Sequence, residues 1–251
     1  MITRRGLVGS LAAGAGGLLL SGCNRINADP GVRSLLQSAE GLTMRAQRII
    51  ADRGDLAREF TAADLSPVFR ANGTRQPAGA DYEAHRLGQF ADWRITVDGL
   101  VARPLSLSMA QIRALPTRTQ ITRHDCVEGW SAIGRWTGVP LKLLLDHAGL
   151  RSSARYLIFH CADRYPQADY YESIDLIDAF HPQTILAWSL NGQLLPVGNG
   201  APLRLRVERQ LGYKHAKYVH RIEAVEKLAV HGKGKGGYWE DHHDYAWYAG
   251  I

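Results

Sequence analysis

A single cysteine stands among several titratable side chains. Cys126 lies in the string TRHDCVEGW, close to His124, Asp125 and Glu128. A thiol serves an enzyme as a thiolate, which either attacks a substrate or binds a soft metal ion. Arg123 and His124 favour the thiolate, whereas Asp125 and Glu128 oppose it, so local charge leaves both roles open. Because an isolated cysteine is more commonly an inert core residue, the rest of the chain must decide.

The segment from Thr122 to Leu143 fits neither the helical nor the strand repeat. Glycines interrupt it, and it carries Trp130 and Trp136. We therefore interpret this segment as a loop that holds chemical groups, entered by a strand over residues 119–123.

The chain has two further cysteines. Cys23 belongs to the N-terminal leader, so Cys126 and Cys161 remain in the mature chain. In an oxidising compartment these two can form one disulfide, which would make both residues structural. There is no CxxC motif, so neither a zinc ribbon nor covalent c-type haem attachment is indicated.

A group of histidines near the C-terminus offers a second metal-binding hypothesis. His231, His242 and His243 lie near Asp241 and Asp244 on a glycine-rich stretch. Such residues can bind zinc opportunistically, but the stretch supplies no fixed scaffold for a tetrahedral site.

Residues 1–23 have the plan of an export signal. They begin with Arg4 and Arg5, continue with an uncharged apolar run and end in small residues. The string TRRGLV is similar to a twin-arginine signal, and LSGC is similar to a lipobox, whose Cys23 would be lipidated. We expect export to the cell envelope or periplasm and attachment to a membrane surface through the lipid on Cys23.

The net charge of the chain limits the classes of partner that it is expected to bind. The formal net charge is +6, and loss of the leader leaves 28 basic against 24 acidic residues. This mild excess, without basic residues interleaved with aromatic ones, argues against nucleic-acid binding.

The elements that must position the chemical groups are short. Apolar residues at helical spacing predict an amphipathic helix over residues 32–50. Strands are predicted over residues 93–101, 156–161, 186–190, 203–207, 217–224 and 225–230, and helices over 108–115, 139–148 and 175–180. Because strands and helices do not alternate strictly, the pattern predicts an α+β fold.

The predicted strand over residues 203–207 places Arg204 and Arg206 on one face. For Arg206 and Arg209 we expect a solvated basic strand edge. We divide the mature chain into an N-terminal helical segment (24–66), one domain (67–230) and a loop-like tail of glycine and aromatic residues that packs on it (231–251).

Several motifs carry a family resemblance. The strings CVEGW at 126–130 and GAPLRL at 200–205, followed by LGYK at 211–214 and Lys217, resemble the sulfite oxidase family of molybdopterin enzymes. The likeness covers residues 72–226 and is greatest to small bacterial members of the methionine sulfoxide reductase type. It implies a single molybdopterin-binding domain without the family's immunoglobulin-like dimerisation domain, acting as a monomeric catalytic subunit.

The resemblance also implies a cofactor and its ligands. Molybdenum would carry one pterin dithiolene, and Cys126 would be its protein thiolate and the catalytic residue. Positions that match cofactor contacts of the family are Asn72, Tyr82, His124, Cys126, Cys161, Asn199, Arg204, His215, Ala216 and Lys217. Cys161 departs from the family pattern, which has Thr there.

The resemblance implies oxygen-atom transfer or redox chemistry at a small sulfur-containing substrate, either sulfite or a sulfoxide, with electrons exchanged with a cytochrome in the membrane or in solution. Arg123, Arg135 and Arg164 can attract an oxyanion. The alternative is a non-catalytic lipoprotein that binds an anion or a partner and holds a Cys126–Cys161 disulfide.

Overall fold

The computed structural model describes residues 29–52 and 54–251, so the expected export signal and Cys23 lie outside the described residues. The chain divides into two compact units, Met1–Ile50 and Ala51–Ile251. In the first unit, helix α2 (Pro30–Ile50) confirms the amphipathic helix expected over residues 32–50. Residues 51–66, which the sequence placed with that helix, belong to the second unit. Among the described residues no helix is long and apolar enough to span a membrane.

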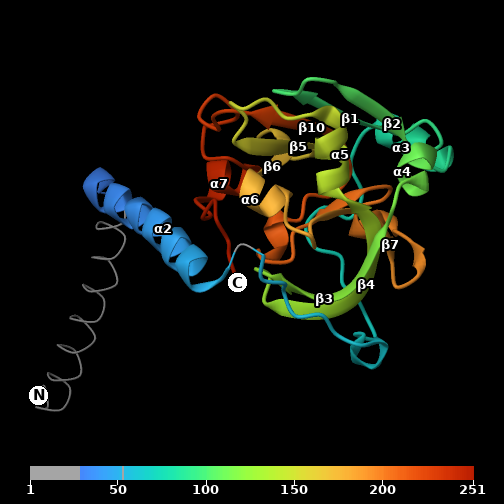
Figure 1. The fold of residues 1–251 in the computed structure, drawn as a ribbon, viewed down its shortest axis with the longest axis horizontal. Helices are drawn as coiled ribbons and strands as arrows, with labels where there is room; N and C mark the ends of the chain where they lie inside the picture. The colour runs from blue at the N-terminus through green and yellow to red at the C-terminus, as the bar shows by residue number, and fades with distance from the viewer. Residues whose placement is uncertain (1–28, 53) are drawn as a thin grey trace, which may run out of the picture. The chain divides into compact units, whose positions relative to one another are not determined.

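The second unit contains two five-stranded sheets (Figure 1). The first has the order β2 (Leu105–Ser108), β1 (Arg94–Gly99), β10 (Val219–Val225), β5 (Tyr156–Arg164) and β6 (Asp169–Asp175). In it, β1 and β10 run parallel and the other pairs run antiparallel. The second sheet consists of β3 (Arg118–Cys126), β4 (Trp130–Pro140), β7 (Ile185–Leu190) and β8 (Gln193–Leu194), with β9 (Arg204–Arg206) paired to β7.

Short helices connect these strands. They are α3 (Ala80–Leu87), α4 (Met109–Ala114), α5 (Leu141–Ala148), α6 (Leu176–Ala179) and α7 (Tyr238–His243), with 3-10 turns η1 (Ala62–Asp64), η2 (Val197–Asn199) and η3 (Gly212–Lys214). The expected α+β class is confirmed.

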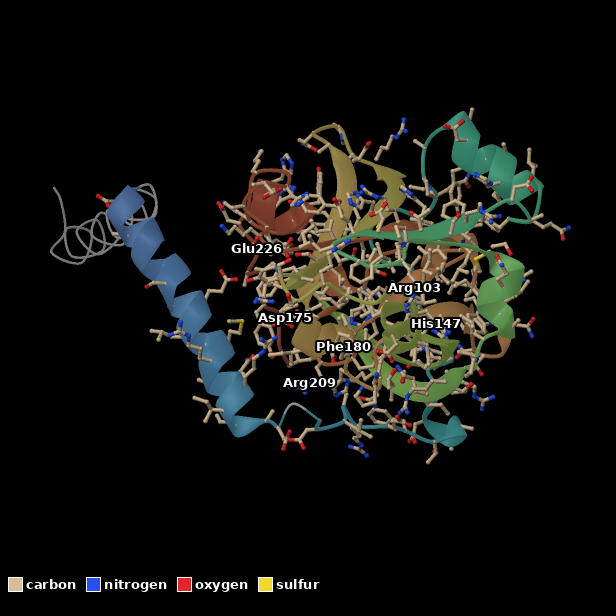
Figure 2. All side chains as sticks on the ribbon, turned by 45° about the horizontal axis from the view of Figure 1, so that its top comes forward. Arg103, His147, Asp175, Phe180, Arg209 and Glu226 are labelled. Carbon is tan, nitrogen blue, oxygen red and sulfur yellow. The ribbon has the colours of Figure 1, made fainter. Side chains whose placement is uncertain are left out.

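Local sequence explains where these helices begin and end. Ser108 caps α4, because its hydroxyl accepts the Gln111 N–H while the Gln111 side chain accepts the Ser108 N–H (3.2 and 2.9 Å). Helix α5 ends at Gly149, whose φ of 69° suits glycine, and Arg103 Nε donates to the carbonyl of His147 at that end (2.9 Å; Figure 2). Asp175 caps the amino end of α6.

One main hydrophobic core joins the two sheets. Helix α5 buries Leu141, Leu144 and Leu145 in it, and both Phe159 of β5 and Val139 of β4 belong to the same cluster. A smaller cluster around Trp136 packs against Phe69. The sheets are therefore held as one body around shared apolar residues.

The segment around Cys126 is a β-hairpin, so its interpretation as a loop was wrong. Strands β3 and β4 pair antiparallel, with Cys126 opposite Trp130. Gly129 closes the turn with a φ of 84° and donates its N–H to the Cys126 carbonyl (3.0 Å). The inward face of β3 carries Gln120, Thr122 and His124. Because these buried residues are polar, the strand lacks the apolar alternation that sequence analysis detects.

Three other expectations need correction. Arg206 and Arg209 are buried, with 0% and 8% of their surfaces exposed, because β9 lies inside the fold and Arg206 pairs with Glu208. The strand expected over residues 225–230 does not form, since β10 ends at Val225. The tail is not wholly loop: its aromatic part forms α7, on which Tyr238 and Glu240 are buried.

Candidate functional site

The β3–β4 hairpin brings Cys126 to the wall of a cavity. The cavity holds about 560 Å³ of space between protein atoms, part of it open to solvent. Asn72, Cys126, His215 and Lys217, all expected at a cofactor site, line it together. The remaining lining residues are Gly73, Thr74, Val127, Glu128, Asp163, Tyr165, Tyr170, Gly212, Tyr213, Trp239 and Tyr245.

The thiol of Cys126 is half-buried. Partial desolvation raises its pKa, and the nearby Glu128 carboxylate adds to this, while a backbone hydrogen bond and the charges of Arg204 and Lys217 lower it. The polypeptide by itself therefore keeps the thiol protonated, as expected of a ligand that is deprotonated when a metal binds.

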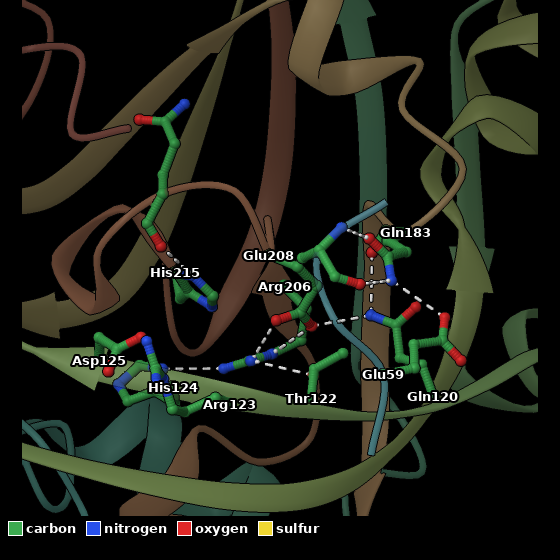
Figure 3. A network of polar contacts seen from close by, with 12 residues as sticks. Glu59, Gln120, Thr122, Arg123, His124, Asp125, Gln183, Arg206, Glu208 and His215 are labelled. Carbon is green, nitrogen blue, oxygen red and sulfur yellow. Dashed lines mark hydrogen bonds and ion pairs between the residues drawn. The ribbon is translucent and has the colours of Figure 1, made fainter. Parts of the chain in front are cut away.

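Two buried histidines lie at the cavity, His215 in its lining and His124 next to His215, with ring centroids 5.0 Å apart. Burial lowers the pKa of both His124 and His215 well below the ordinary value, helped by neighbouring positive charges. Arg206 Nη1 donates to His124 Nδ1 (2.9 Å), so the His124 proton lies on Nε2, which has no partner (Figure 3). His215 Nε2 donates to the Gln210 carbonyl (3.0 Å), so its Nδ1 is an unpartnered acceptor.

A polar network anchors His124 from behind (Figure 3). Arg206 forms a fully buried ion pair with Glu208 (2.5 Å). Gln120 Nε2 donates to Glu208 Oε1 (2.7 Å) and to the Gln183 carbonyl (3.0 Å). This network fixes the orientation of the His124 ring, since Arg206 holds the ring and the network holds Arg206.

Arg204 has a different environment from Arg206. It is fully buried and donates to the carbonyls of Asn199 (3.0 Å) and His215 (3.2 Å), while its Nε has no partner. Among the described residues no carboxylate lies within ion-pair distance of it, and burial beside Arg206 lowers its pKa to about 9. A buried guanidinium without an acidic partner is costly unless an anion joins it, so this position fits an anionic ligand such as a phosphate.

Lys217 ties together the loops that flank the cavity. Its Nζ donates to the carbonyls of Asn72 (2.6 Å), Thr74 and Gly198 (3.0 Å). Burial and the charge of Arg204 lower its pKa to about 7. The amide oxygen of Asn72 on the same loop is buried without a partner. Asn72 therefore presents a polar group that a ligand in the cavity can engage, whereas Lys217 Nζ is occupied by its three carbonyl acceptors.

Two acids also line the cavity. Glu128 accepts from Trp130 Nε1 (3.0 Å) and from the Gly73 N–H (3.1 Å), and these bonds lower its pKa. Asp163 is 2% exposed, and burial raises its pKa to about 7 against the opposing effects of Lys217 and Thr74. Its Oδ1 has no partner.

The other expected cofactor residues divide into two groups. His124, Asn199, Arg204 and Ala216 do not line the cavity but adjoin residues that do. The His124 ring meets that of His215, Arg204 bonds the carbonyls of Asn199 and His215, and Ala216 stands between His215 and Lys217 in the chain. Tyr82 and Cys161 instead line a second cavity, where the Tyr82 hydroxyl donates to the Ala201 carbonyl (2.7 Å). Their role as cofactor contacts stays a prediction.

Both Cys126 and Cys161 are free thiols, so the structure contains no disulfide between them. Over the described part of the chain, no group of three His, Cys, Asp or Glu side chains is arranged to hold a metal ion. The suggested zinc site is therefore not assembled. Asp241 instead accepts from the Tyr171 hydroxyl (2.6 Å) and from the N–H of Lys233 (2.8 Å).

Sequence reasoning missed Asp163 and the aromatic residues of the cavity. A signal existed for Asp163: it occupies an inward position of the buried strand β5, in phase with Leu157 and Phe159. An acid at such a position is rarely accidental. For Trp239 and Tyr245 no local signal existed, because their part in the cavity depends on where the tail docks.

Comparisons with known proteins agree with this geometry. The profile of the family described as "Oxidoreductase molybdopterin binding domain" matches residues 83–231. A "Putative protein-methionine-sulfoxide reductase subunit YedZ1" of Azospira oryzae is 39% identical over 94% of this chain and 83% of that protein.

A "Protein-methionine-sulfoxide reductase catalytic subunit MsrP" of Xanthomonas axonopodis pv. citri is 38% identical over 56% of this chain and 47% of its own length. The chain thus spans about half of that relative. Among solved structures, the sulfane dehydrogenase SoxCD of Paracoccus pantotrophus shares the fold with a TM-score of 0.51, at 24% identity over 55% of this chain and 39% of that one.

Proposed function

Because the chain belongs to the family of proteins with an oxidoreductase molybdopterin-binding domain, we propose that it reduces organic sulfoxides to thioethers. The chain is a molybdopterin-dependent oxidoreductase, and the choice of substrate is the part we infer. The observation that carries it is the chemistry of the cavity around Cys126, together with the relatives named as methionine-sulfoxide reductases.

The residues present fit the cofactor. The Cys126 thiol suits a soft, redox-active metal, and Arg204, which lacks an acidic partner, suits the pterin phosphate. The unpartnered atoms Asn72 Oδ1, His124 Nε2 and His215 Nδ1 can hydrogen-bond a polar heterocycle. When bound, the molybdenum centre supplies two-electron oxygen-atom chemistry, while the chain supplies binding, orientation and protons.

The charges of the cavity favour a neutral substrate. Lys217 uses its Nζ on backbone carbonyls, and Glu128 and Asp163 are acids. Arg123, Arg135 and Arg164, which the sequence offered as oxyanion attractors, do not line the cavity. An oxyanion such as sulfite would meet two carboxyl groups there, whereas a sulfoxide carries no net charge.

The reaction balances with two electrons and two protons, which convert the sulfoxide oxygen into water and leave a thioether. Asp163 is placed to deliver one proton, because its carboxyl faces the cavity and is about half protonated near pH 7. Glu128 stays ionised and holds the Gly73 loop and Trp130.

We place the electron source on a separate protein. The relatives are named as subunits, which supports the proposal that a second chain takes part in the assembly. A cytochrome, either in the membrane or in solution, is the partner we propose.

We also propose export and lipid anchoring, on the residues of the leader alone. Lysine substitution of both Arg4 and Arg5 should block export, and Cys23→Ala should move the exported protein from the detergent phase to the aqueous phase in a Triton X-114 partition. Unchanged partition of the Cys23→Ala protein would remove the anchor from this proposal.

The test of the function is a matched pair of cysteine variants. Protein from a molybdenum-cofactor-competent host should contain about one molybdenum per chain and should reduce methionine sulfoxide with reduced viologen. Cys126→Ser should fold but lose nearly all turnover, because a hydroxyl is a harder and weaker ligand. Full activity of Cys126→Ser, or wild-type protein without molybdenum, would refute the assignment.

Cys161→Ser is the control. Cys161 lines a different cavity and its Sγ contacts the Phe159 carbonyl (3.7 Å), so this variant should keep its molybdenum and most of its activity. Molybdenum loss in Cys161→Ser would instead support the family-based contact between Cys161 and the cofactor.

A further inference from the structure

The residues that follow the family match complete one wall of the cavity. The matched domain ends at residue 231, yet Trp239 and Tyr245 of the tail line the same cavity as Cys126. Tyr165, Tyr170 and Tyr213 line it from the domain. The cavity thus has five aromatic residues on its surface, two of them from the tail.

These rings form one contiguous surface. Trp239 and Tyr245 stack, with ring centroids 5.7 Å apart and an interplanar angle of 27°. Tyr245 meets Tyr213 edge-on at 5.1 Å, and Tyr165 meets Trp239 edge-on at 5.7 Å. We refer to Tyr165, Tyr213, Trp239 and Tyr245 as the aromatic wall.

The tail is fixed in place by buried contacts, so the wall is preorganised. Glu240 of α7 pairs with Lys214 (2.6 Å), which also pairs with Glu172 of β6 (2.5 Å), and all three side chains are fully buried. A Cβ at position 237 would collide with both carboxylates, so the close approach of the chain there requires Gly237.

Main-chain contacts hold the tail as well. The Tyr213 hydroxyl donates to the Ala246 carbonyl (2.6 Å), and the Leu211 N–H donates to the Ala249 carbonyl (2.9 Å). The first bond comes from within η3, the turn next to the cavity, and the second comes from Leu211, the residue before it.

We propose that the aromatic wall binds the S-alkyl group of an uncharged organic sulfoxide and makes the enzyme select such substrates over inorganic sulfur oxyanions. This inference rests on the proposed sulfoxide reduction and names what sets its specificity. Among the described residues that line the cavity, the one lysine or arginine is Lys217, which is held by carbonyls, and Glu128 and Asp163 share the cavity.

The physical chemistry of aromatic rings supports this choice. The sulfur and methyl groups of a sulfoxide carry partial positive charge, which the negative face of an aromatic ring attracts. Contacts between divalent sulfur and aromatic rings contribute about 0.3–1.5 kcal/mol each, so the thioether product is also accommodated. An oxyanion gains nothing from such faces and loses its hydration there.

The experiment compares leucine and phenylalanine variants of the molybdenum-loaded, full-length protein. Trp239→Leu/Tyr245→Leu removes both rings of the tail, whereas Trp239→Phe/Tyr245→Phe keeps aromatic faces at both positions. We expect the leucine pair to raise KM for the methyl ester of N-acetylmethionine sulfoxide, which is uncharged, about tenfold with kcat within about twofold, and the phenylalanine pair to stay within about twofold in both. The inhibition constant of sulfite should change less than twofold in either.

Equal effects of the two pairs, an unchanged KM in the leucine pair, or a matching change in sulfite inhibition would overturn the inference.

A titration followed by tryptophan fluorescence tests the inference even if the leucine pair fails to fold. The methyl ester of N-acetylmethionine sulfoxide should change the Trp239 emission of the wild type, seen as the difference from Trp239→Phe, and sulfite should not. The absence of that difference overturns the proposed role of the aromatic wall. Wild-type protein that loads molybdenum but reduces no sulfoxide would refute the proposed function, whereas active wild type with unaffected leucine variants would refute the wall alone.

Discussion

Two arginines of β9, with one residue between them, differ in the charges that surround them. Both are fully buried, and both lie over the Trp136 ring, at 5.1 Å for Arg204 and 4.4 Å for Arg206. Arg206 has Glu208 as a buried counter-charge, whereas Arg204 has only carbonyl acceptors. This difference is the basis of our proposal that Arg206 stabilises the fold whereas Arg204 binds the cofactor phosphate.

Substitution of each arginine by methionine tests this difference, since methionine keeps volume and removes charge. Arg206→Met leaves Glu208 buried without its partner and should lower the free energy of unfolding by about 3–5 kcal/mol. Arg204→Met removes hydrogen bonds to two carbonyls and should cost about 1–2 kcal/mol in cofactor-free protein. Urea titration of cofactor-free protein measures both.

Cofactor occupancy gives the complementary measurement. Arg204→Met should lose most of its molybdopterin. In the wild type, the Arg204 guanidinium has no acidic partner among the described residues and can therefore bind the pterin phosphate. If Arg204→Met keeps full occupancy while losing as much stability as Arg206→Met, Arg204 is a structural residue and the phosphate assignment is wrong.

The raised pKa of Asp163 predicts that the stability of the cofactor-free protein depends on pH. Its pKa is raised to about 7 by burial, from 3.8 in an unfolded chain, so the folded protein binds more protons than the unfolded one between these values. The free energy of unfolding therefore falls as pH rises from 4 to 7, with a limiting slope of about 1.4 kcal/mol per pH unit for one proton.

Asp163→Asn should remove this contribution in cofactor-free protein. The variant and the wild type should have similar stability near pH 4, where the buried carboxyl is neutral, and the variant should become relatively more stable toward pH 7. Denaturant titrations at pH 4, 5, 6 and 7 measure the difference. Parallel curves for the two proteins would show that folding does not raise the pKa of Asp163.

At the scale of elements, a glycine explains how two strands approach each other. A Cβ at Gly138 would lie 2.6 Å from Ala187 Cα and even closer to the Leu186 carbonyl, both of them backbone atoms of β7. The register between β4 and β7 shifts at the same place, between Thr137 and Gly138. Neither neighbour can move without the strand moving.

Gly138→Ala should therefore destabilise the protein by more than about 2 kcal/mol. Gly88→Ala is the matched control, because Gly88 ends α3 with a φ of −79° and a Cβ there would approach protein no closer than 3.4 Å. We expect a change within about 0.5 kcal/mol for the control. Thermal unfolding of both variants checks this, and equal shifts would mean that the β4–β7 contact tolerates a side chain.

The sequence predicted elements well where local chemistry is decisive. The helices predicted over residues 108–115 and 139–148 are present as α4 and α5, because the cap at Ser108 and the stop at Gly149 each depend on a few adjacent residues. The family motifs also placed Asn72, Cys126, His215 and Lys217 at one cavity.

The elements that sequence analysis missed depend on tertiary contacts. The inner face of β3 is polar, so it gave no alternation. Its Gln120 and His124 side chains bond to Glu208, which follows β9, and to Arg206 of β9. The burial of Arg206 itself follows from a strand pairing between β7 and β9 that local sequence does not encode. The helix α7 and its place in the site depend on Lys214, a residue 26 positions before Glu240.

At the scale of the whole second unit, the site draws on both sheets and the tail. Cys126 comes from β3 of one sheet and Asp163 from β5 of the other, while Trp239 comes from α7. A ligand that engages several of these elements binds only the folded chain, so its binding free energy adds to the stability of folding.

Cofactor loading should therefore raise the unfolding temperature of the protein. The unpartnered buried atoms of Asn72, His124, Arg204 and His215 are a cost that the cofactor-free chain bears and that bound cofactor can relieve. A cofactor concentration of about 1,000 times the dissociation constant adds about 4 kcal/mol to the free energy of unfolding. For a domain of this size, this corresponds to a rise of about 8–16 °C in the unfolding temperature. Calorimetry of protein from hosts with and without molybdopterin synthesis measures the shift, and Arg204→Met should show a smaller one. If loaded and cofactor-free wild type melt together, the cofactor does not bind across these elements, and the site must be sought elsewhere in the domain.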